Sequence, residues 1–345
     1  MSREALPLLE PPCAVRLSSP AGRLPTINRV RITLVLLSLL AALSLGAAQA
    51  SAACTPKANL EAIVDDSTSM ALSDPYRLRL RAMELLIDTQ GNEARTLAAV
   101  EFGSEARAVF APGVIGTSGA AFKAAMAAAL VADGGGTDYN AGFAAASAQN
   151  PFANARIFLT DGQHTGYQPY ADRHAGGPPV YVIGLGIGFA DSPADLLLRR
   201  IAKETGGVYR RVDEAGQLQP AMFDVDSVIA CMVNPKRFAD RFRRTGRPSV
   251  HAVTIPSGTR AAQFALTWTN SADSFTVGDF RVLRRGRLSK VRGLKVSRRR
   301  GPTFTAVKVS GAIAGKLRFA VKAAKLAKPG RAVELTTQVT RRARR

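Results

Sequence analysis

The sequence is poor in the residues that most often carry catalytic or zinc chemistry, because its 345 residues include only three cysteines, three histidines and one tryptophan. The histidines at positions 164, 174 and 251 show no H-E-x-x-H or similar zinc-binding spacing. A G-x-S-x-G nucleophile elbow and a G-x-x-x-x-G-K-[ST] phosphate loop are also missing. We find no nucleophile beside a base that would activate it, and we therefore predict a binding protein and not an enzyme.

A largely apolar run near the start of the chain predicts export. This run covers residues 32–48, with Arg29 and Arg31 before it and small residues that offer A-x-A cleavage sites after it. The order is typical of a secretory signal peptide, so we assign residues 1–53 to one and predict a secreted or cell-surface protein. Two alternatives stay open. The run is just long enough to remain as a membrane anchor, or Cys54 is a lipidated N-terminal cysteine.

Export would leave two cysteines in the mature chain, because Cys13 lies in the predicted signal peptide. An even pair in an oxidising compartment indicates a disulfide between Cys54 and Cys231. Such a bond would close a loop of more than 170 residues, for which the loss of chain entropy in the unfolded state gives roughly 4–5 kcal/mol of stabilisation. The alternative is two buried free thiols.

Charge is distributed unevenly along the chain. The predicted signal peptide has a net charge of +3, residues 54–233 have a net charge of −6, and residues 234–345 have a net charge of +24. The C-terminal segment reaches that value with 28 Lys and Arg residues against four Asp and Glu. An acidic middle followed by a very basic end indicates two units with different surfaces.

Strand and helix patterns alternate between residues 59 and 231. Continuous apolar runs such as "ARIFLTDG" and "PPVYVIGLGIG" are typical of parallel strands that are covered on both faces. The neighbouring segments "TLAAVEFG" and "ARAVFAP" predict a hairpin. We therefore predict a doubly wound, mostly parallel α/β sheet over residues 54–233. In such sheets ligands bind beyond the carboxyl ends of the strands.

The pattern changes after residue 234. Short segments with partial alternation, separated by Gly, Pro, Ser and Asn, predict a small all-β, sandwich-like domain over residues 249–340. We expect Trp268 in the core of that domain. We assign residues 234–248 to a basic linker and residues 341–345 to a disordered basic tail.

Oxygen-bearing side chains follow two of the predicted buried strands. Asp65, Ser67 and Ser69 form a D-x-S-x-S loop after the first strand, and Asp161 ends the strand "IFLTD". Thr137 follows a glycine tract at the start of a predicted helix. A doubly wound sheet would bring these loops together at one edge. Carboxylate and hydroxyl oxygens suit a hard divalent cation such as Mg²⁺.

These three elements, in this order, resemble the von Willebrand factor A family and its metal-ion-dependent adhesion site. The segments "VYVIGLGIG" and "LLLRRIAKETGGVYRRVDEAGQL" also resemble the closing half of that family, so the resemblance covers about residues 54–233. It implies a von Willebrand factor A (Rossmann-like) fold in which Ser67, Ser69 and Thr137 bind the ion directly or nearly so. Asp65 and Asp161 would act directly or through bound water.

The resemblance also implies what the ion does. Neutral hydroxyls and few direct carboxylates would leave Mg²⁺, or Mn²⁺ or Ca²⁺ in its place, with residual positive charge. The ion would then accept an Asp or Glu side chain from a protein partner as its last ligand, as expected of an adhesion module. The alternative is a regulatory or scaffold subunit of a larger complex, in which the metal is structural.

Three polar residues near these loops receive simpler interpretations. Asp66 is expected to be a solvated or helix-capping carboxylate that points away from Asp65. Asp138 is expected to cap the helix that it precedes. His164 is interpreted as a polar loop residue.

The basic region, residues 234–345, is predicted to bind anionic cell-surface polymers, with an ordinary solvated surface as the equal alternative. No nucleic-acid-binding signature interleaves aromatic residues with the charges, so nucleic acid is not an expected partner. Membrane contact is expected only through residues 1–53, if they are not cleaved.

Overall fold

The computed structural model describes residues 54–90, 94–284, 286–328, 330 and 333–342. The predicted signal peptide and residues 343–345 lie outside the described residues. Residues Cys54–Arg345 form one compact unit, as judged from the spatial contacts between them. No helix in the described part is long and apolar enough to cross a lipid bilayer.

The first half of this unit is built on a six-stranded sheet with the order β3-β2-β1-β4-β5-β6. All neighbours in it are parallel except β2 and β3, which form the predicted antiparallel hairpin. The interior strands are buried on both faces, as their continuous apolar sequences predicted. The strands are β1 Asn59–Asp65, β2 Thr96–Phe102, β3 Ala106–Val114, β4 Ala155–Thr160, β5 Val180–Leu185 and β6 Tyr209–Val212.

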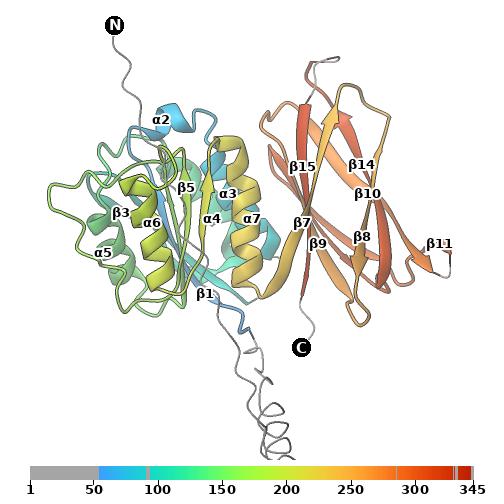
Figure 1. The fold of residues 1–345 in the computed structure, drawn as a ribbon, viewed down its shortest axis with the longest axis horizontal. Coiled ribbons are helices and arrows are strands. Elements are labelled where there is room, and N and C mark those ends of the chain that lie inside the picture. The colour runs from blue at the N-terminus through green and yellow to red at the C-terminus, as the bar shows by residue number, and fades with distance from the viewer. Residues whose placement is uncertain (1–53, 91–93, 285, 329, 331–332, 343–345) are drawn as a thin grey trace, which may run out of the picture. The chain divides into compact units, whose positions relative to one another are not determined.

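Helices cover both faces of this sheet (Figure 1). Alternate side chains of β1 point to opposite faces, so that Leu60 and Val64 pack with α3, α4 and α7, whereas Ile63 packs with α5 and α6. The sheet and its helices, here called the α/β part, therefore form three layers, and the predicted fold class is confirmed. The helices are α2 Met70–Ser73, α3 Leu78–Gln90, α4 Ile115–Ala129, α5 Tyr139–Gln149, α6 Pro193–Glu204, η1 Ala215–Gln217 and α7 Leu218–Ile229.

The second half, here called the β part, contains two antiparallel sheets around their own apolar core. One sheet has the order β11-β10-β14-β8 and the other has the order β12-β13-β9-β15-β7. Trp268 is 4% exposed and packs edge-on against Phe275, so its predicted core position is confirmed. The strands are β7 Met232–Phe242, β8 Ser249–Ile255, β9 Ala261–Thr267, β10 Ser274–Arg284, β11 Arg287–Lys290, β12 Lys295–Arg300, β13 Phe304–Ser310, β14 Gly315–Lys325 and β15 Val333–Arg342.

The start of the β part differs from the prediction of a linker over residues 234–248. β7 begins only three residues after α7 ends and pairs along its length with β15. Its basic residues suggested a linker, but Phe238 and Phe242 at alternate positions pack on the core, as in a strand with one buried face. Only residues 243–248 connect β7 to β8. Arg341, which we assigned to a disordered tail, lies in β15.

The two parts share buried contacts. On α7, every residue except Val228 is buried, because the helix packs on the sheet of the α/β part and also meets β7, β9 and β15. Between the parts, Gln338 donates through Nε2 to the Pro220 carbonyl at 3.1 Å and to Asp224 Oδ1 at 2.9 Å. A small apolar cluster continues this contact, and its members are Leu85, Phe223, Ala265, Phe304 and Ala306.

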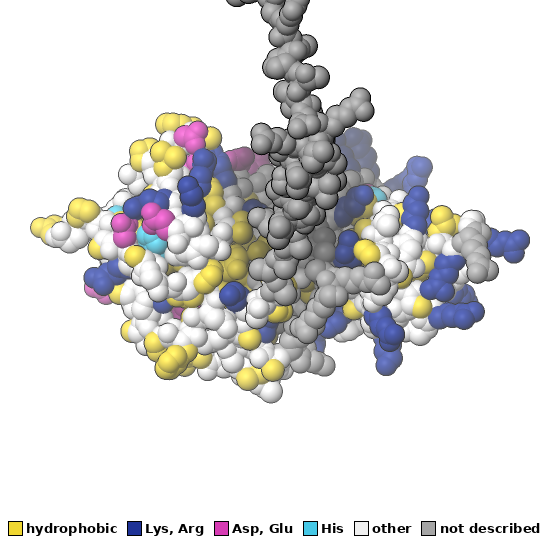
Figure 2. All heavy atoms as spheres, turned by 60° about the horizontal axis from the view of Figure 1, so that its bottom comes forward, with side chains coloured by type: hydrophobic (Ala, Val, Ile, Leu, Met, Phe, Trp, Pro, Cys, Tyr) yellow, Lys and Arg dark blue, Asp and Glu magenta, His cyan; other side chains and the backbone are white. Residues whose placement is uncertain are grey.

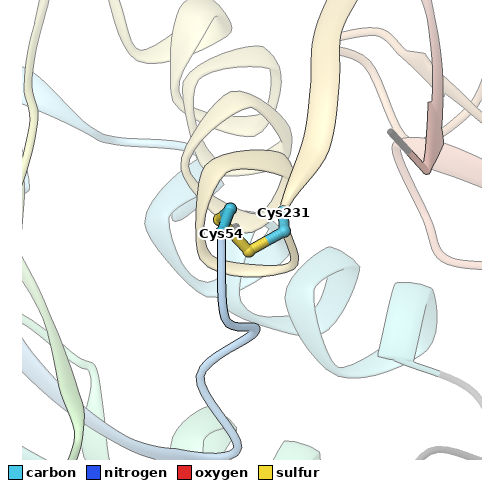
Figure 3. The surroundings of a disulfide bond; sticks show 2 residues. All are labelled: Cys54 and Cys231. Carbon is cyan, nitrogen blue, oxygen red and sulfur yellow. A yellow bond between two sulfur atoms is a disulfide. The ribbon is translucent and has the colours of Figure 1, made fainter. Parts of the chain in front are cut away.

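A disulfide joins the beginning of the described chain to the end of α7 (Figure 3). The Cα atoms of Cys54 and Cys231 are 5.6 Å apart, within the range that a disulfide bridges. Close by, the Lys57 amide donates to the Ile229 carbonyl at 3.0 Å. The predicted pairing of these cysteines is confirmed, and it closes the α/β part upon itself across 177 positions.

Candidate metal centre

The carboxyl ends of β1 and β4 lie next to each other in the sheet. The two strands are parallel and hydrogen-bonded neighbours, with Val64 of β1 opposite Leu159 of β4. The next residue on each strand is therefore the last one of its strand, Asp65 on β1 and Thr160 on β4. Asp161 begins the loop after β4. The sheet thus brings two carboxylates that are 96 positions apart in the sequence to one edge.

Asp65 is fully buried and held by two hydrogen bonds. Its Oδ1 accepts from the Ser67 amide at 2.8 Å, and its Oδ2 accepts from the Thr160 hydroxyl at 2.5 Å. Burial raises the pKa of Asp65 to about 6. The hydrogen bonds from Ser67 and Thr160 lower this pKa, and the negative charge of Asp161 raises it further. The carboxylate is fixed in position, which is what a preformed ion site requires.

Three loops meet here: the first follows β1 (residues 66–69), the second precedes α5 (residues 130–138) and the third follows β4 (residues 161–179). A chain of hydroxyls connects the first loop to the third. Ser67 Oγ lies 3.0 Å from Ser69 Oγ, and Ser69 Oγ donates to Asp161 Oδ1 at 2.8 Å. The Ser73 hydroxyl donates to the other oxygen of Asp161. Four of the five predicted ligands are therefore in one hydrogen-bonded group, with Asp65 joined to it through the Ser67 backbone.

Thr137 is positioned by the same third loop. Its amide donates to the Thr165 hydroxyl at 2.9 Å, and the Thr165 amide donates to the Thr137 carbonyl at 2.8 Å. A Cβ atom placed on Gly162 would lie 3.1 Å from Thr137 Oγ1, so the Thr137 side chain packs against the residue that follows Asp161. The structure thus brings all five predicted residues to the same edge of the sheet.

The chemistry of this donor set fits a hard divalent cation. It consists of two carboxylates and three hydroxyls, all of them oxygen ligands. Thr137 is 5% exposed, and its hydroxyl lies against the residue that follows Asp161. The described residues contain no group of three or more His, Cys, Asp and Glu side chains that would form a different metal site. An ion here would depend on the hydroxyls.

Asp66 corrects our expectation of a solvated or helix-capping carboxylate. It is 1% exposed and forms a buried ion pair with Arg79 of α3, whose NH2 lies 2.7 Å from its Oδ1. Arg79 also pairs with Asp74 at 3.2 Å. The Asp66 Oδ1 in addition accepts from the Ala132 amide at 2.8 Å. We interpreted this residue from its local sequence alone, and its partners are 13 and 66 positions away.

The glycine tract before Thr137 packs directly on the first loop. The Gly134 amide donates to the Asp66 carbonyl at 2.9 Å, and the Thr68 amide donates to the Gly135 carbonyl at 2.9 Å. Gly103, in the turn between β2 and β3, also contacts this tract: a Cβ atom on it would lie 2.0 Å from the Gly134 carbonyl oxygen, so only glycine permits the approach of that turn. The first and second loops are therefore held together by their main chains.

The neighbouring polar residues have structural roles. The Asp138 carboxylate accepts from the amides of Asn140 and Ala141, which confirms its predicted capping of α5. His164 Nδ1 accepts from the Tyr139 amide at 3.1 Å, and its Nε2 lies 2.9 Å from the Gln168 carbonyl. His164 is thus a loop residue held by backbone groups, as we expected.

Sequence reasoning missed the residues that support the predicted ligands. Thr160 holds Asp65, Ser73 holds Asp161, and Arg79 holds the first loop through Asp66. The position of Thr160 at the end of a strand beside Asp65 was the one signal that could have identified a supporting residue. Ser73, at the end of α2, and Arg79, at the start of α3, carry no such signal, because a serine or an arginine at a helix end is ordinarily solvated.

Comparison with known proteins gives structural matches only. No family model and no curated protein matches the chain. Among solved structures, a von Willebrand factor type A protein from Catenulispora acidiphila matches 83% of this chain and 58% of its own, at 18% identity and a TM-score of 0.45. Proximal thread matrix protein 1 from the mussel byssus, in a form with a zinc-occupied MIDAS motif, matches 54% of this chain and 50% of its own, at 19% identity and a TM-score of 0.42.

A third match is the pilus adhesin SpaC from Lactobacillus rhamnosus GG, at 12% identity and a TM-score of 0.44 over 84% of this chain and 44% of that one. The chain thus spans about half the length of these three proteins. They show what it is similar to, whereas the assignment of its fold depends on the strand order, the hairpin and the helical layers described above. By these features the α/β part has the predicted doubly wound, mostly parallel α/β fold, with one antiparallel hairpin at its edge.

Proposed function

We propose that this chain is an exported member of the von Willebrand factor A family, which binds one divalent cation and captures a protein partner through it. The proposed ligands are Asp65, Ser67, Ser69, Thr137 and Asp161. The observation that carries the proposal is the meeting of these five oxygen-bearing side chains, from three loops, at the carboxyl edge of one sheet. The proposed ion is Mg²⁺, and Mn²⁺ or Ca²⁺ suit the same oxygen donors.

The balance of charge around the site supports capture of an acidic side chain. Asp65 and Asp161 are the two carboxylates in the donor set, and the hydroxyls add no charge. The third nearby carboxylate, Asp66, is engaged in a buried ion pair with Arg79, which Arg79 shares with Asp74. We propose that at least one of Asp65 and Asp161 acts through bound water, so that a divalent cation keeps positive charge and an exchangeable position for an Asp or Glu of a partner. We propose this binding role in preference to catalysis.

Export is supported by two independent features. The first is the apolar segment that ends before Cys54 in the sequence. The second is the disulfide between Cys54 and Cys231, a bond that persists in oxidising compartments. We propose that the folded unit functions outside the cytoplasm, where a disulfide is stable and a surface partner is accessible.

The metal site is tested by titrating Mn²⁺ into the purified protein by calorimetry. Asp161→Ala removes a carboxylate from the loop after β4, and Thr137→Val removes a hydroxyl from the loop before α5. Each variant is expected to bind Mn²⁺ at least ten-fold more weakly than wild type. Asp133→Asn is the matched control, because Asp133 is on the same loop as Thr137 but is not a proposed ligand, and its side chain is 60% exposed. Wild-type affinity in Asp161→Ala and Thr137→Val would reject the assignment.

The capture function requires a second experiment. Immobilised wild type and Asp161→Ala are incubated with cell-surface extract in Mg²⁺, and the bound proteins are then released with a chelator. We expect proteins that elute from wild type and are missing from the variant. If the ion raises the melting temperature while the captured proteins are the same with and without it, the metal is structural, and the scaffold interpretation replaces ours.

A further inference from the structure

The β part contains a long segment in which every charged residue is basic. Residues 280–333 include 17 Lys and Arg residues and not one Asp or Glu. This segment runs from β10 to the start of β15 and so contributes to both sheets of the β part. Lys and Arg side chains project from the visible surface of the β part in Figure 2. The excess of charge that the sequence assigned to the whole C-terminal region is therefore concentrated on particular strands.

The highest density of charge lies on two edge strands. β11 is the edge strand of the four-stranded sheet, and β12 is the edge strand of the five-stranded sheet. They follow each other in the chain with only residues 291–294 between them, so they lie on the same side of the β part. β12 pairs with β13 on one side, and its other side is open in the described part of the chain. We call this region the basic edge; its seven charged residues are Arg287, Lys290, Arg292, Lys295, Arg298, Arg299 and Arg300.

All seven side chains of the basic edge are exposed. None of them forms an ion pair with another described residue, although the preceding Arg281 pairs with Asp279. Their charges are therefore not neutralised within the described part of the protein. A dense group of guanidinium and ammonium groups without ion-pair partners attracts anions over about one Debye length and repels cations. It therefore raises the local concentration of anionic ligands.

We propose that the basic edge binds a linear polyanion that carries a phosphate in every repeat. Five of the seven groups are Arg, whose planar guanidinium binds phosphate oxygens through two parallel hydrogen bonds. Side chains at alternate positions of a strand are about 6.6–6.8 Å apart, so Arg298 and Arg300 form a row at this spacing on one face of β12, while Lys295 and Arg299 share the other face with Ser297 between them. A chain of repeating phosphates matches such a row better than one compact anion does.

The arrangement favours a flexible polymer over a flat membrane. Arg298, Arg299 and Arg300 are consecutive, so Arg299 points to the opposite face of the sheet from its two neighbours. All three are exposed. A linear polymer can follow the open edge and contact Arg298 and Arg300 on one face and Arg299 on the other, where Arg299 lines a hollow together with Asp88 and Thr89 of α3. A planar bilayer would meet only one face.

The basic edge also lacks the side chains that read nucleic acid bases. No Phe, Tyr or Trp occurs between Phe280 and Phe304, so the edge has no platform on which unpaired bases could stack. The interaction is therefore expected to depend on phosphates and on salt. It involves no residue of the proposed metal site, and the two sites can be tested separately.

The test measures binding of fluorescent long-chain inorganic polyphosphate to the whole protein at several salt concentrations. Wild type is compared with a triple variant of β12, Arg298→Gln, Arg299→Gln and Arg300→Gln. The control triple variant, Arg241→Gln, Arg243→Gln and Arg244→Gln, makes the same change of charge at the β7 side of the same sheet. The changed residues are exposed in both variants, and melting temperatures check that the fold is kept.

We expect the β12 variant to bind at least ten-fold more weakly at 100 mM salt. Its slope of log K against log salt should decrease in magnitude by about 2, since each lost phosphate contact removes about 0.7 for a single strand. The control variant and the addition of a chelator should leave both values close to wild type. The single variant Arg299→Gln should reduce the slope by about 0.7, which provides a test that a folding defect of the triple variant cannot obscure.

Three results would overturn the proposal. An equal loss of polyphosphate affinity in the control variant would show that polyphosphate is attracted by the net charge of the protein and has no specific site at the basic edge. Loss of binding with the chelator would place the polyanion at the metal. Tighter binding of hyaluronate, of duplex DNA or of phosphatidylglycerol vesicles than of polyphosphate, with the same dependence on β12, would replace the phosphate polymer by that partner.

Discussion

The α/β part and the β part use charge in opposite ways. The α/β part buries ionisable groups, and Glu61, Asp65, Asp66 and Arg79 are all at most 1% exposed. In the β part the charges of the basic edge are exposed, and they form no ion pair with any residue that the structure describes. Buried charges act on their immediate neighbours and fix loops in place, whereas exposed charges act together over longer distances and contribute little to folding. The sign and number of charges in a sequence do not distinguish these two uses.

Removing the disulfide should give the largest change in stability and should act on the α/β part, because residues 234–345 contain no cysteine. Replacing both cysteines, Cys54→Ala with Cys231→Ala, should lower the free energy of unfolding by about 5 kcal/mol, since the bond restricts a long loop of the unfolded chain. Urea unfolding of the variant and of wild type measures this. Wild type in reducing agent should match the variant, and equal stability of variant and oxidised wild type would contradict the prediction.

Breaking the buried ion pairs should give the next largest effect. Arg79→Met leaves Asp66 and Asp74 buried without their cation, which should cost about 3–5 kcal/mol and loosen the first loop. Urea unfolding gives the stability, and Mn²⁺ titration of the folded variant should give weaker binding. Arg299→Met on the basic edge is the matched control, with the same change of side chain at an exposed position. If the two variants unfold at the same urea concentration, the contrast between the parts is wrong.

Glu61 should make the stability of the α/β part depend on pH. Its carboxyl group is fully buried, and burial raises the pKa of Glu61 from 4.5 to about 8, although hydrogen bonding by Asn150 and the positive charge of Arg156 oppose the shift. The unfolded chain therefore releases this proton at lower pH than the folded protein does, and stability falls as pH rises from about 4.5 to 8. Between pH 5 and pH 7 the loss should be about 2–3 kcal/mol.

The variant Glu61→Gln should remove this part of the pH dependence, since an amide does not titrate. Urea unfolding at pH 5 and pH 7 measures the free energy of both proteins. The difference between wild type and variant isolates Glu61 from Asp65, whose raised pKa contributes equally to both. A difference that stays constant between the two pH values would show that Glu61 is ionised in the folded protein.

The smallest effect on stability is expected on the basic edge. Arg298→Gln should leave the urea midpoint unchanged, because the side chain is exposed and has no ion pair in the described residues. The same variant should reduce the salt dependence of polyphosphate binding by about 0.7. Such a result would show that this charge affects binding and not folding, in contrast to the buried charges of the α/β part. A large loss of stability would mean that the basic edge is part of the fold.

Much of the fold was predictable because its signals are local. The buried runs of β4 and β5 are too apolar for any exposed element, and the hairpin of β2 and β3 follows from two adjoining strand patterns. β7 was not predicted, because its basic residues resemble a linker and its partner strand β15 begins about 90 positions later. The same difficulty applies to β12, where five of six residues are polar or charged on an edge that only one neighbour pairs.

The candidate site shows the same division. Its five proposed ligands could be named from spacing and from the rule that ligands bind at the carboxyl ends of strands. The residues that support them could not, because hydrogen bonds such as that from Thr160 to Asp65 join positions 95 apart. The error over Asp66 has the same origin, since a lone carboxylate beside a ligand gives no indication that an arginine of α3 will pair with it.

The sequence by itself determined the alternation of strands and helices, the cysteine pair, the candidate ligands and the separation of negative from positive charge. These depend on composition and on short periodic patterns, and each residue contributes to them independently. Only the tertiary structure decided which charges are buried, which hydroxyls meet, and that the basic residues of β11 and β12 lie together on two open strand edges. Burial and edge position depend on which distant segments pack together, and that information is shared among many residues and belongs to no single stretch of the chain.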